Sequence, residues 1–160
     1  MGQGEGAVQQ VMYSFGERSR RELATCKKEL RSVMELAIKR SAVDFGITQG
    51  ERTVEEQKRF FLQGASKIDP DRYTPQELVK KAKHIVNEFE PKSRAVDIYI
   101  FVKGRKDLAF DERYVIYVAG VIESCARELG VPMRWGGNWD MDGEIITDQR
   151  FQDLVHFELL

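Results

Sequence analysis

Residues 94–101 read Arg-Ala-Val-Asp-Ile-Tyr-Ile-Phe, and this stretch predicts the strand around which the chain is organised. It is an almost uninterrupted apolar run rich in β-branched and aromatic residues, which is typical of a strand buried in a sheet. One carboxylate, Asp97, lies in the middle of the run. An ionised carboxylate in such a place is costly unless a cation or another partner neutralises it. What Asp97 faces is therefore the first question that the sequence raises about function.

Helices are predicted on both sides of this strand. Apolar residues recur at helical spacing in 27–40 and in 111–129. Two Thr-x-x-Glu capping boxes, beginning at Thr53 and Thr74, predict the starts of two further helices.

Alternating apolar and polar residues predict two more strands, at 43–48 and at 151–160. The segment 134–139, with its Gly pair and two Trp residues, is predicted to be a loop. Helices and strands mix without the regular rhythm of parallel α/β folds. The expected fold class is α+β, with a small, largely antiparallel sheet packed with helices.

Length and composition predict a flexible leader, residues 1–12, followed by a single domain, residues 13–160. The formal net charge of -1 argues against a nucleic-acid partner, and no apolar run is long enough for membrane insertion. The N-terminal residues lack the pattern of a signal peptide, so any action outside the cytoplasm would need another route. Cys26 and Cys125 are predicted to be buried free thiols, and we expect a monomer.

The two histidines of the chain, His84 and His156, suggest a partner for Asp97. Two imidazoles and a carboxylate are enough for a catalytic zinc with an open fourth position. Hydrolysis also needs a carboxylate that takes a proton from water, and Asp153 lies three residues before His156. Arg52, in the turn after the strand at 43–48, is a candidate for binding an oxyanion or a substrate carboxylate.

Each of these residues also has a purely structural interpretation. A single histidine is usually a surface residue or a hydrogen-bonded core residue. Asp97 can pair with Arg94 or with a distant lysine, and Arg52 can be a solvated turn residue. The spacings by themselves define only a weak metal motif.

A longer pattern adds to this reading: His84, then Ala-Val-Asp at 95–97, then Asp-x-x-His-Phe-Glu at 153–158. It resembles the zinc peptidases of the D-alanyl-D-alanine carboxypeptidase type, above all the phage L-alanyl-D-glutamate endopeptidases, or endolysins. The resemblance covers nearly the whole chain after the leader. Further matching segments are 15–19, 36–41, 44–48, 52–55, 73–75, 129–132 and 134–137.

The resemblance implies a Hedgehog/DD-peptidase-like zinc peptidase fold, with zinc on His84, Asp97 and His156. It implies Asp153 as the catalytic base and Arg52 as a residue that stabilises the transition state. The implied substrate is the stem peptide of peptidoglycan, cut between L-Ala and D-Glu. An endolysin would wait in the cytoplasm of the infected host cell and reach the wall after a membrane pore opens.

The chain departs from the family pattern between its first two motif residues. The usual motif is Ser-x-His-x-x-Gly-x-Ala-x-Asp, but Ala82 stands in place of Ser, the Gly is missing, and 87–93 adds residues that include Glu88 and Glu90. An inserted loop can bulge outward while both ligands stay in place, because added loop length costs little free energy. Two alternatives therefore stay open: a D-Ala-D-Ala carboxypeptidase with the same metal site, and a peptidoglycan-binding relic disabled by the insertion.

A second cation site is suggested by 138–145, Asn-Trp-Asp-Met-Asp-Gly-Glu-Ile, followed by Asp148 and Gln149. Oxygen ligands at alternate positions before a Gly follow the calcium-loop pattern. The proposed ligands are Asn138, Asp140, Asp142, Glu144 and Gln149. Asn138 replaces the usual leading Asp and Gln149 the usual Glu, so an acidic solvated turn explains the segment equally well.

Overall fold

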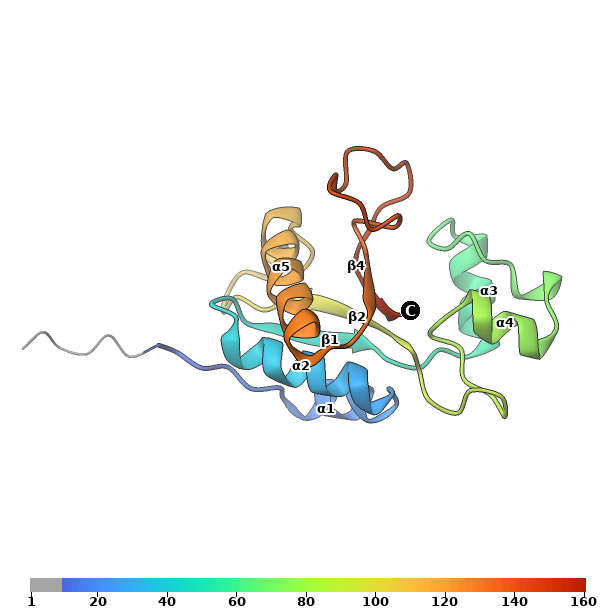
Figure 1. Cartoon of the computed structure of the whole chain (residues 1–160), viewed down its shortest axis with the longest axis horizontal. Helices are drawn as coiled ribbons and strands as arrows, with labels where there is room; N and C mark the ends of the chain where they lie inside the picture. Colours follow the sequence, from blue (N-terminus) through green and yellow to red (C-terminus); the bar gives the residue numbers. More distant parts are fainter. Residues whose placement is uncertain (1–9) are drawn as a thin grey trace, which may run out of the picture.

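The predicted central strand is β2 (Ala95–Ile100), which lies between two neighbours in a four-stranded sheet. A computed structural model describes residues 10–160. The strand order is β1-β2-β4-β3, where β1 is Phe45–Gln49, β4 is Asp153–Leu159 and β3 is Met133–Gly136. All neighbouring strands are antiparallel, which confirms the α+β class (Figure 1).

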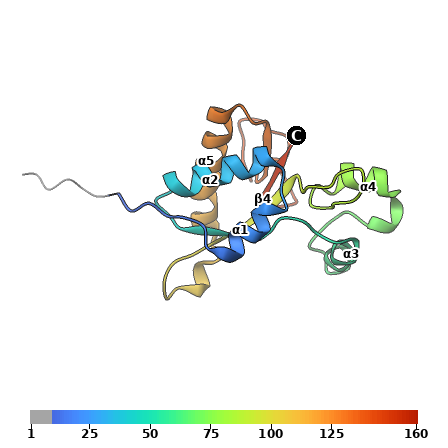
Figure 2. The same cartoon turned by 90° about the horizontal axis from the view of Figure 1, so that it is seen from below.

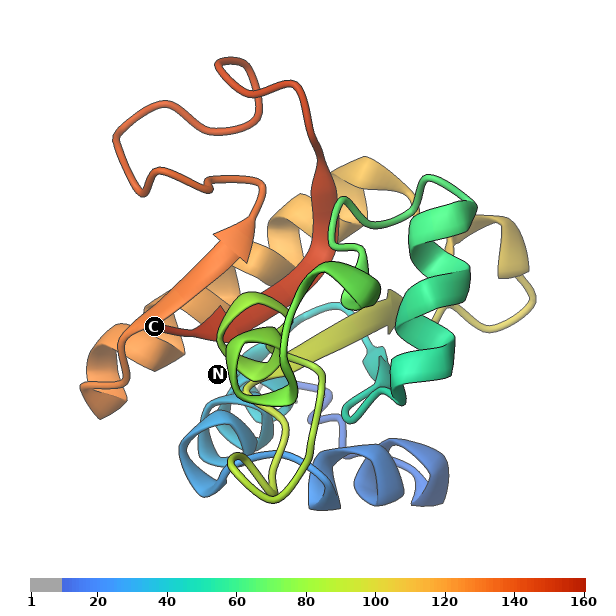
Figure 3. The ribbon, with the colours of Figure 1, turned by 90° about the vertical axis from the view of Figure 1, so that its right-hand side faces the viewer.

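The helices form two groups on opposite sides of this sheet. The helices are α1 (Glu17–Ala24), α2 (Lys28–Arg40), α3 (Val54–Leu62), α4 (Pro75–Lys81) and α5 (Glu112–Leu129), with short 3-10 turns at Pro70–Arg72 and Lys106–Leu108. Figure 2 shows α1, α2 and α5 together and α3 and α4 apart from them. Figure 3, viewed from the side of α3 and α4, shows these two helices in front of the sheet and α5 behind it.

The alternation of β2 separates the core from the functional face. Val96 and Ile98 are fully buried in the main core, together with apolar residues of α2 and α5. Asp97 points to the other face because successive side chains of a strand alternate. In the register with β4, Val96 lies opposite Phe157 and Asp97 lies opposite His156. The sheet therefore places a carboxylate and an imidazole side by side.

Local signals set the helix ends. Both predicted capping boxes are formed, with the Thr53 and Thr74 side chains accepting from the backbone N–H three residues on. Asp111 accepts a hydrogen bond from the backbone N–H of Arg113 at the start of α5, and Gly130, with a φ of 67°, ends it.

The loop predicted at 134–139 is wrong for its first part, because β3 continues to Gly136. Trp135 is buried and donates from Nε1 to the carbonyl of Leu154 at 2.7 Å. A Cβ on Gly136 would lie 2.0 Å from the carbonyl oxygen of Asp153, so only a glycine lets the two paired strands approach so closely there. The strand depends on β4 for its hydrogen bonds, and β4 comes much later in the chain.

Three other expectations concern the N-terminal leader, the two cysteines and the absence of a membrane-spanning helix. The predicted leader, 1–12, lies outside the described residues as far as residue 9, and Tyr13 packs against the main core. Cys26 and Cys125 are buried and free, as predicted. Within residues 10–160, every helix is too short or too polar to span a membrane.

Candidate functional site

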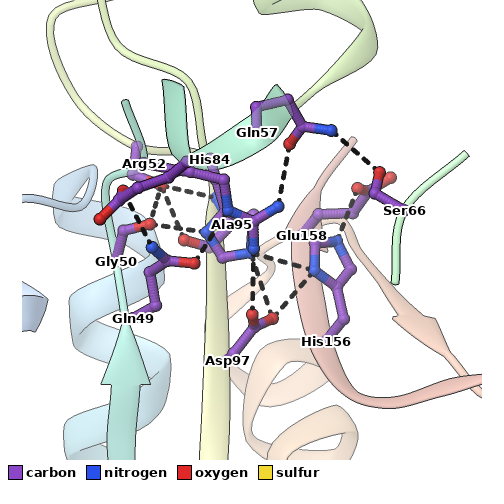
Figure 4. Close-up of polar contacts among 12 residues, drawn as sticks. Gln49, Gly50, Arg52, Gln57, Ser66, His84, Ala95, Asp97, His156 and Glu158 are labelled. Carbon is purple, nitrogen blue, oxygen red and sulfur yellow. Dashed lines mark hydrogen bonds and ion pairs between the residues drawn. The ribbon is translucent and has the colours of Figure 1, made fainter. Parts of the chain in front are cut away.

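The structure brings His84, Asp97 and His156 together on the side of the sheet that faces α3 and α4 (Figure 4). His84 follows α4, whereas the other two residues lie on β2 and β4. The His84 Nε2 lies 3.1 Å from Asp97 Oδ1 and 3.2 Å from His156 Nδ1. The His156 Nδ1 lies 3.1 Å from the same Asp97 oxygen. Three donor atoms from distant parts of the chain thus form a nearly equilateral triangle.

This triangle fits a zinc ion. Zinc binds nitrogen and oxygen donors at about 2.0–2.2 Å in tetrahedral geometry, so two ligand atoms are about 3.3–3.6 Å apart. The three separations of 3.1–3.2 Å are within a few tenths of an ångström of that value. The donor set of two imidazoles and one carboxylate is also typical of catalytic zinc, which leaves a fourth position for water or substrate.

His84 is held in the tautomer that a metal needs. Its ring is buried, and Nδ1 donates to the carbonyl oxygen of Gly50 at 2.6 Å. Burial lowers the pKa of His84, so the ring is neutral and the Nε2 lone pair faces Asp97 and His156.

His156 carries the balancing proton in the metal-free protein. Burial acts against its charge, but hydrogen bonds to Asp97 and Glu158 raise its pKa to about 10. Burial likewise opposes the charge of Asp97, yet the two histidines hold the pKa of that carboxyl well below its usual range. The site is therefore built to keep a cation beside a largely buried carboxylate.

Arg52 is fixed in place by protein contacts. Its Nε donates to Gln49 Oε1 at 2.9 Å, Nη1 donates to Gln57 Oε1 at 3.0 Å, and Nη2 lies 3.4 Å from Asp97 Oδ2. The guanidinium also lies 4.4 Å from the centre of the Phe60 ring. Since a guanidinium has five N–H groups, two remain for another ligand. Asp97 thus pairs with Arg52 and both histidines, and not with Arg94, which the structural interpretation allowed.

Asp153 begins β4 and lines the same cavity as the three candidate ligands and Arg52. Its side chain is half-buried. Burial and the charge of Asp97 raise the pKa of Asp153 to about 6. A carboxylate with a pKa near neutrality is suited to accept a proton from water. All five residues expected at the catalytic centre therefore meet in one place.

The cavity has a volume of about 380 Å³ and a mixed lining. Phe60, Trp139 and Phe151 supply aromatic surface. Besides Arg52, four cationic residues line it: Lys67, Lys81, Lys83 and Arg134. Carboxylates are fewer there, namely Asp97, Asp153 and Glu158. The cavity is suited to an anionic ligand with some apolar surface.

The insertion at 87–93 packs away from the metal triangle. Its Glu90 pairs with Lys27 at 3.1 Å, and Glu88 is exposed. Ser93 donates from its backbone N–H to the carbonyl of Thr25 at 2.8 Å, so the loop is tied to the α1–α2 corner. The Ser93 hydroxyl lies 2.7 Å from the Ala95 carbonyl oxygen and 3.1 Å from the Gly50 carbonyl oxygen, which accepts from His84. The loop bulges outward, and its last residue supports the site.

The acidic loop brings two of the predicted calcium ligands together with a third carboxylate. The carboxylates of Asp140, Asp142 and Asp148 lie within 4.8 Å of one another, and all three are exposed. Of the three predicted calcium ligands that carry a carboxylate, Asp140 and Asp142 belong to this group and Glu144 does not. Gln149 instead accepts from the backbone N–H of Trp139 at 3.0 Å and donates to the Gly136 carbonyl at 2.9 Å.

The two other predicted ligands also have partners within the loop. The Glu144 carboxylate accepts from the Thr147 hydroxyl at 2.6 Å, and the Asn138 amide donates to the carbonyl of Asp142 at 3.0 Å. The Glu144 contact joins two side chains, and the Asn138 contact ties a side chain to the loop backbone.

Sequence reasoning missed the residues that support the site, chiefly Gln57, Arg134 and Glu158. Gln57 is buried on α3 and gives no signal in the sequence. Glu158 does give one, because it lies two residues after His156 and so faces the same side of β4.

Comparison with known proteins agrees with this geometry. Residues 11–160 match the family model of the phage L-alanyl-D-glutamate peptidase. The chain is similar to the L-alanyl-D-glutamate peptidase of Escherichia phage T5, with 32% identity over 135 residues, which cover 84% of this chain and 87% of the relative. It also resembles the crystal structure of the Serratia marcescens L-Ala D-Glu endopeptidase ChiX, with a TM-score of 0.66 and 22% identity, covering 97% of this chain and 94% of that one.

Proposed function

Since the chain belongs to the phage L-alanyl-D-glutamate peptidase family, we propose that it cuts the stem peptides of peptidoglycan with a zinc ion held by His84, Asp97 and His156. The chain is an L-alanyl-D-glutamate peptidase of phage type, and its substrate is peptidoglycan. The identity of the metal is the first part of the proposal. The observation that carries it is the triangle of three donor atoms 3.1–3.2 Å apart.

Zinc in such a site supplies a Lewis acid that polarises a carbonyl and makes water more acidic. In this proposal Asp153 accepts the proton of the attacking water and delivers it to the leaving amine. Arg52 directs its two remaining N–H groups at the oxygen of the scissile carbonyl, where negative charge develops. Gln57 and Phe60 keep the guanidinium in that position before substrate arrives.

The charges of the cavity support a stem peptide as the ligand. Such a peptide carries free carboxylates beyond the scissile bond, and the cavity has more cationic than anionic residues. Lys83 is a candidate for binding one of these carboxylates, because it lines the cavity and is half-buried. Burial and the nearby Arg94 lower the pKa of Lys83, which an incoming carboxylate would counteract.

Three further parts of the proposal concern the setting of the enzyme. We place the single catalytic domain at 13–160, expect it to act as a monomer, and assign its accumulation to the cytoplasm of the infected host until a membrane pore opens.

We also propose that the acidic loop binds calcium, with Asp140, Asp142 and Asp148 among its ligands. Such binding would order the loop that leads to Asp153.

Digestion of purified peptidoglycan, with mass spectrometry of the products, tests the proposal. The enzyme is assayed after chelation and again after zinc is restored. New fragments with a free D-Glu amino terminus, formed only with zinc, are expected. Loss of single D-Ala residues would instead indicate a carboxypeptidase, and binding without cleavage in any condition would indicate a disabled relic.

A further inference from the structure

Glu158 is a buried carboxylate that the proposed mechanism does not use. Its side chain is 7% exposed, and it lies on β4 two residues after His156. Its Oε2 accepts a hydrogen bond from His156 Nε2 at 2.9 Å. A buried charge without several partners is strongly destabilising, so a carboxylate in this position needs a specific reason.

Arg134 supplies the second partner of Glu158. It lies directly opposite Glu158 in the pairing of β3 with β4. The Arg134 Nε donates to Glu158 Oε1 at 3.0 Å, and Nη2 donates to the same oxygen. The two carboxylate oxygens therefore have separate tasks, since one faces the arginine and the other faces the histidine.

The contact with Glu158 decides which nitrogen of His156 is free. Because Nε2 carries the hydrogen that is donated to Glu158, the lone pair of the metal-ready ring must be on Nδ1. That atom lies 3.1 Å from Asp97 Oδ1 and 3.2 Å from His84 Nε2. A ring flip would break the contact with Glu158 and remove Nδ1 from the triangle.

The face of the His156 ring is supported by the same group of residues. Trp139 lies with its ring centre 5.7 Å from that of His156. The Arg134 guanidinium lies 5.5 Å from the centre of the Trp139 ring, and its Nη1 is 3.4 Å from the Trp139 carbonyl. Arg134 therefore holds both the carboxylate at the edge of the imidazole and the indole beside it.

We propose that Glu158, anchored by Arg134, is a positioning residue that fixes His156 in the tautomer and orientation that present Nδ1 to the metal. The inference rests on the proposed zinc site and extends it to residues that do not touch the metal. Carboxylates that accept the second N–H of a metal-bound histidine typically contribute ten- to hundredfold to metal affinity. A cross-strand ion pair that only stabilised the sheet would leave that affinity unchanged.

The test is the zinc dissociation constant, measured by competition with a chromogenic chelator on metal-free protein. Glu158→Ala is expected to weaken zinc binding by up to about a hundredfold. Glu158→Gln keeps an acceptor for the histidine N–H but loses the charge, and we expect about a tenfold loss. Glu128→Gln is the matched control, because it breaks a Glu–Arg pair with Arg40 at the exposed junction of α2 and α5.

The visible spectrum of bound Co²⁺ gives a second readout, since it reports ligand geometry directly. It should change in both Glu158 variants and stay the same in the Glu128 control. Far-UV circular dichroism shows whether each variant is folded, and Glu158→Gln, which is close in shape, decides the question if the alanine variant does not fold. A wild-type protein that binds no zinc would overturn the proposed metal site. If the wild-type protein binds zinc and the Glu158 variants have zinc dissociation constants within twofold of the wild-type value, this inference alone would be overturned.

Discussion

Replacement of Asp153 by asparagine is expected to remove turnover while making the metal-free protein more stable. Burial and the charge of Asp97 raise the pKa of Asp153 from 3.8 to about 6. Because the folded protein binds this proton more tightly than the unfolded chain does, the ionised carboxylate destabilises the fold. The rise in pKa corresponds to at most about 3 kcal/mol of unfolding free energy. Since the side chain is partly solvated, we expect Asp153→Asn to recover about 1–3 kcal/mol at pH 7.5.

The pH dependence gives the sign of the effect. Below about pH 4 the carboxyl is protonated in both states, so wild type and variant should be equally stable. Between pH 4 and 6 the unfolded chain loses this proton while the folded wild type keeps it, so the difference grows and should reach its full size above pH 6. For a chain of this length, the expected gain in Tm at pH 7.5 is about 2–12 °C. Thermal unfolding of the metal-free proteins at pH 4 and 7.5 measures it.

The catalytic effect is measured on the same variant after zinc is restored. Loss of a general base typically lowers the rate by a factor of 10²–10⁴, whereas zinc content should be unchanged. The wild-type rate should fall as pH drops through about 6 or lower, because a bound cation lowers the pKa of a nearby carboxylate. A variant with full activity would refute the assignment of the base. A variant that is no more stable than wild type at pH 7.5 would show that the fold does not hold Asp153 in an unfavourable state.

Three other changes have expected outcomes. Gln57→Leu should lower the unfolding free energy by about 1–3 kcal/mol and also reduce activity, because Arg52 Nη1 and two other half-buried polar groups lose their contact with Gln57. In urea unfolding, the exposed Gln63→Leu should differ from wild type by less than about 0.5 kcal/mol. His156→Ala should lose both zinc and turnover, and a variant that still copurifies with stoichiometric zinc would contradict its role as a ligand. Cys26 should react with a thiol reagent only when the protein unfolds, since burial raises its pKa to about 12, and rapid labelling of the native protein would contradict this.

Much of the fold could be read from local patterns. The β-branched run of β2, the capping boxes of α3 and α4, and the Asp and Gly that bound α5 act through neighbouring residues, so the sequence was enough to predict them. The three candidate ligands were also identifiable, because the chain has two histidines and a carboxylate in a strand that should be apolar. Their significance came mainly from the longer family pattern, since the spacing alone allowed structural interpretations.

What only the tertiary structure decided depends on contacts between distant segments. β3 exists because β4 supplies its hydrogen bonds, and no local signal in 134–136 shows this. His84 and His156 are 72 residues apart, so the 3.2 Å between His84 Nε2 and His156 Nδ1 is not set by any spacing in the chain. It depends on long-range contacts, such as the backbone hydrogen bond from Arg52 to the carbonyl of His84. The same holds for the contacts of Arg52 with Gln57 and of Glu158 with Arg134. The sequence by itself determined which groups could do chemistry, and the fold determined their distances, because side chains from separate elements meet only after those elements pack.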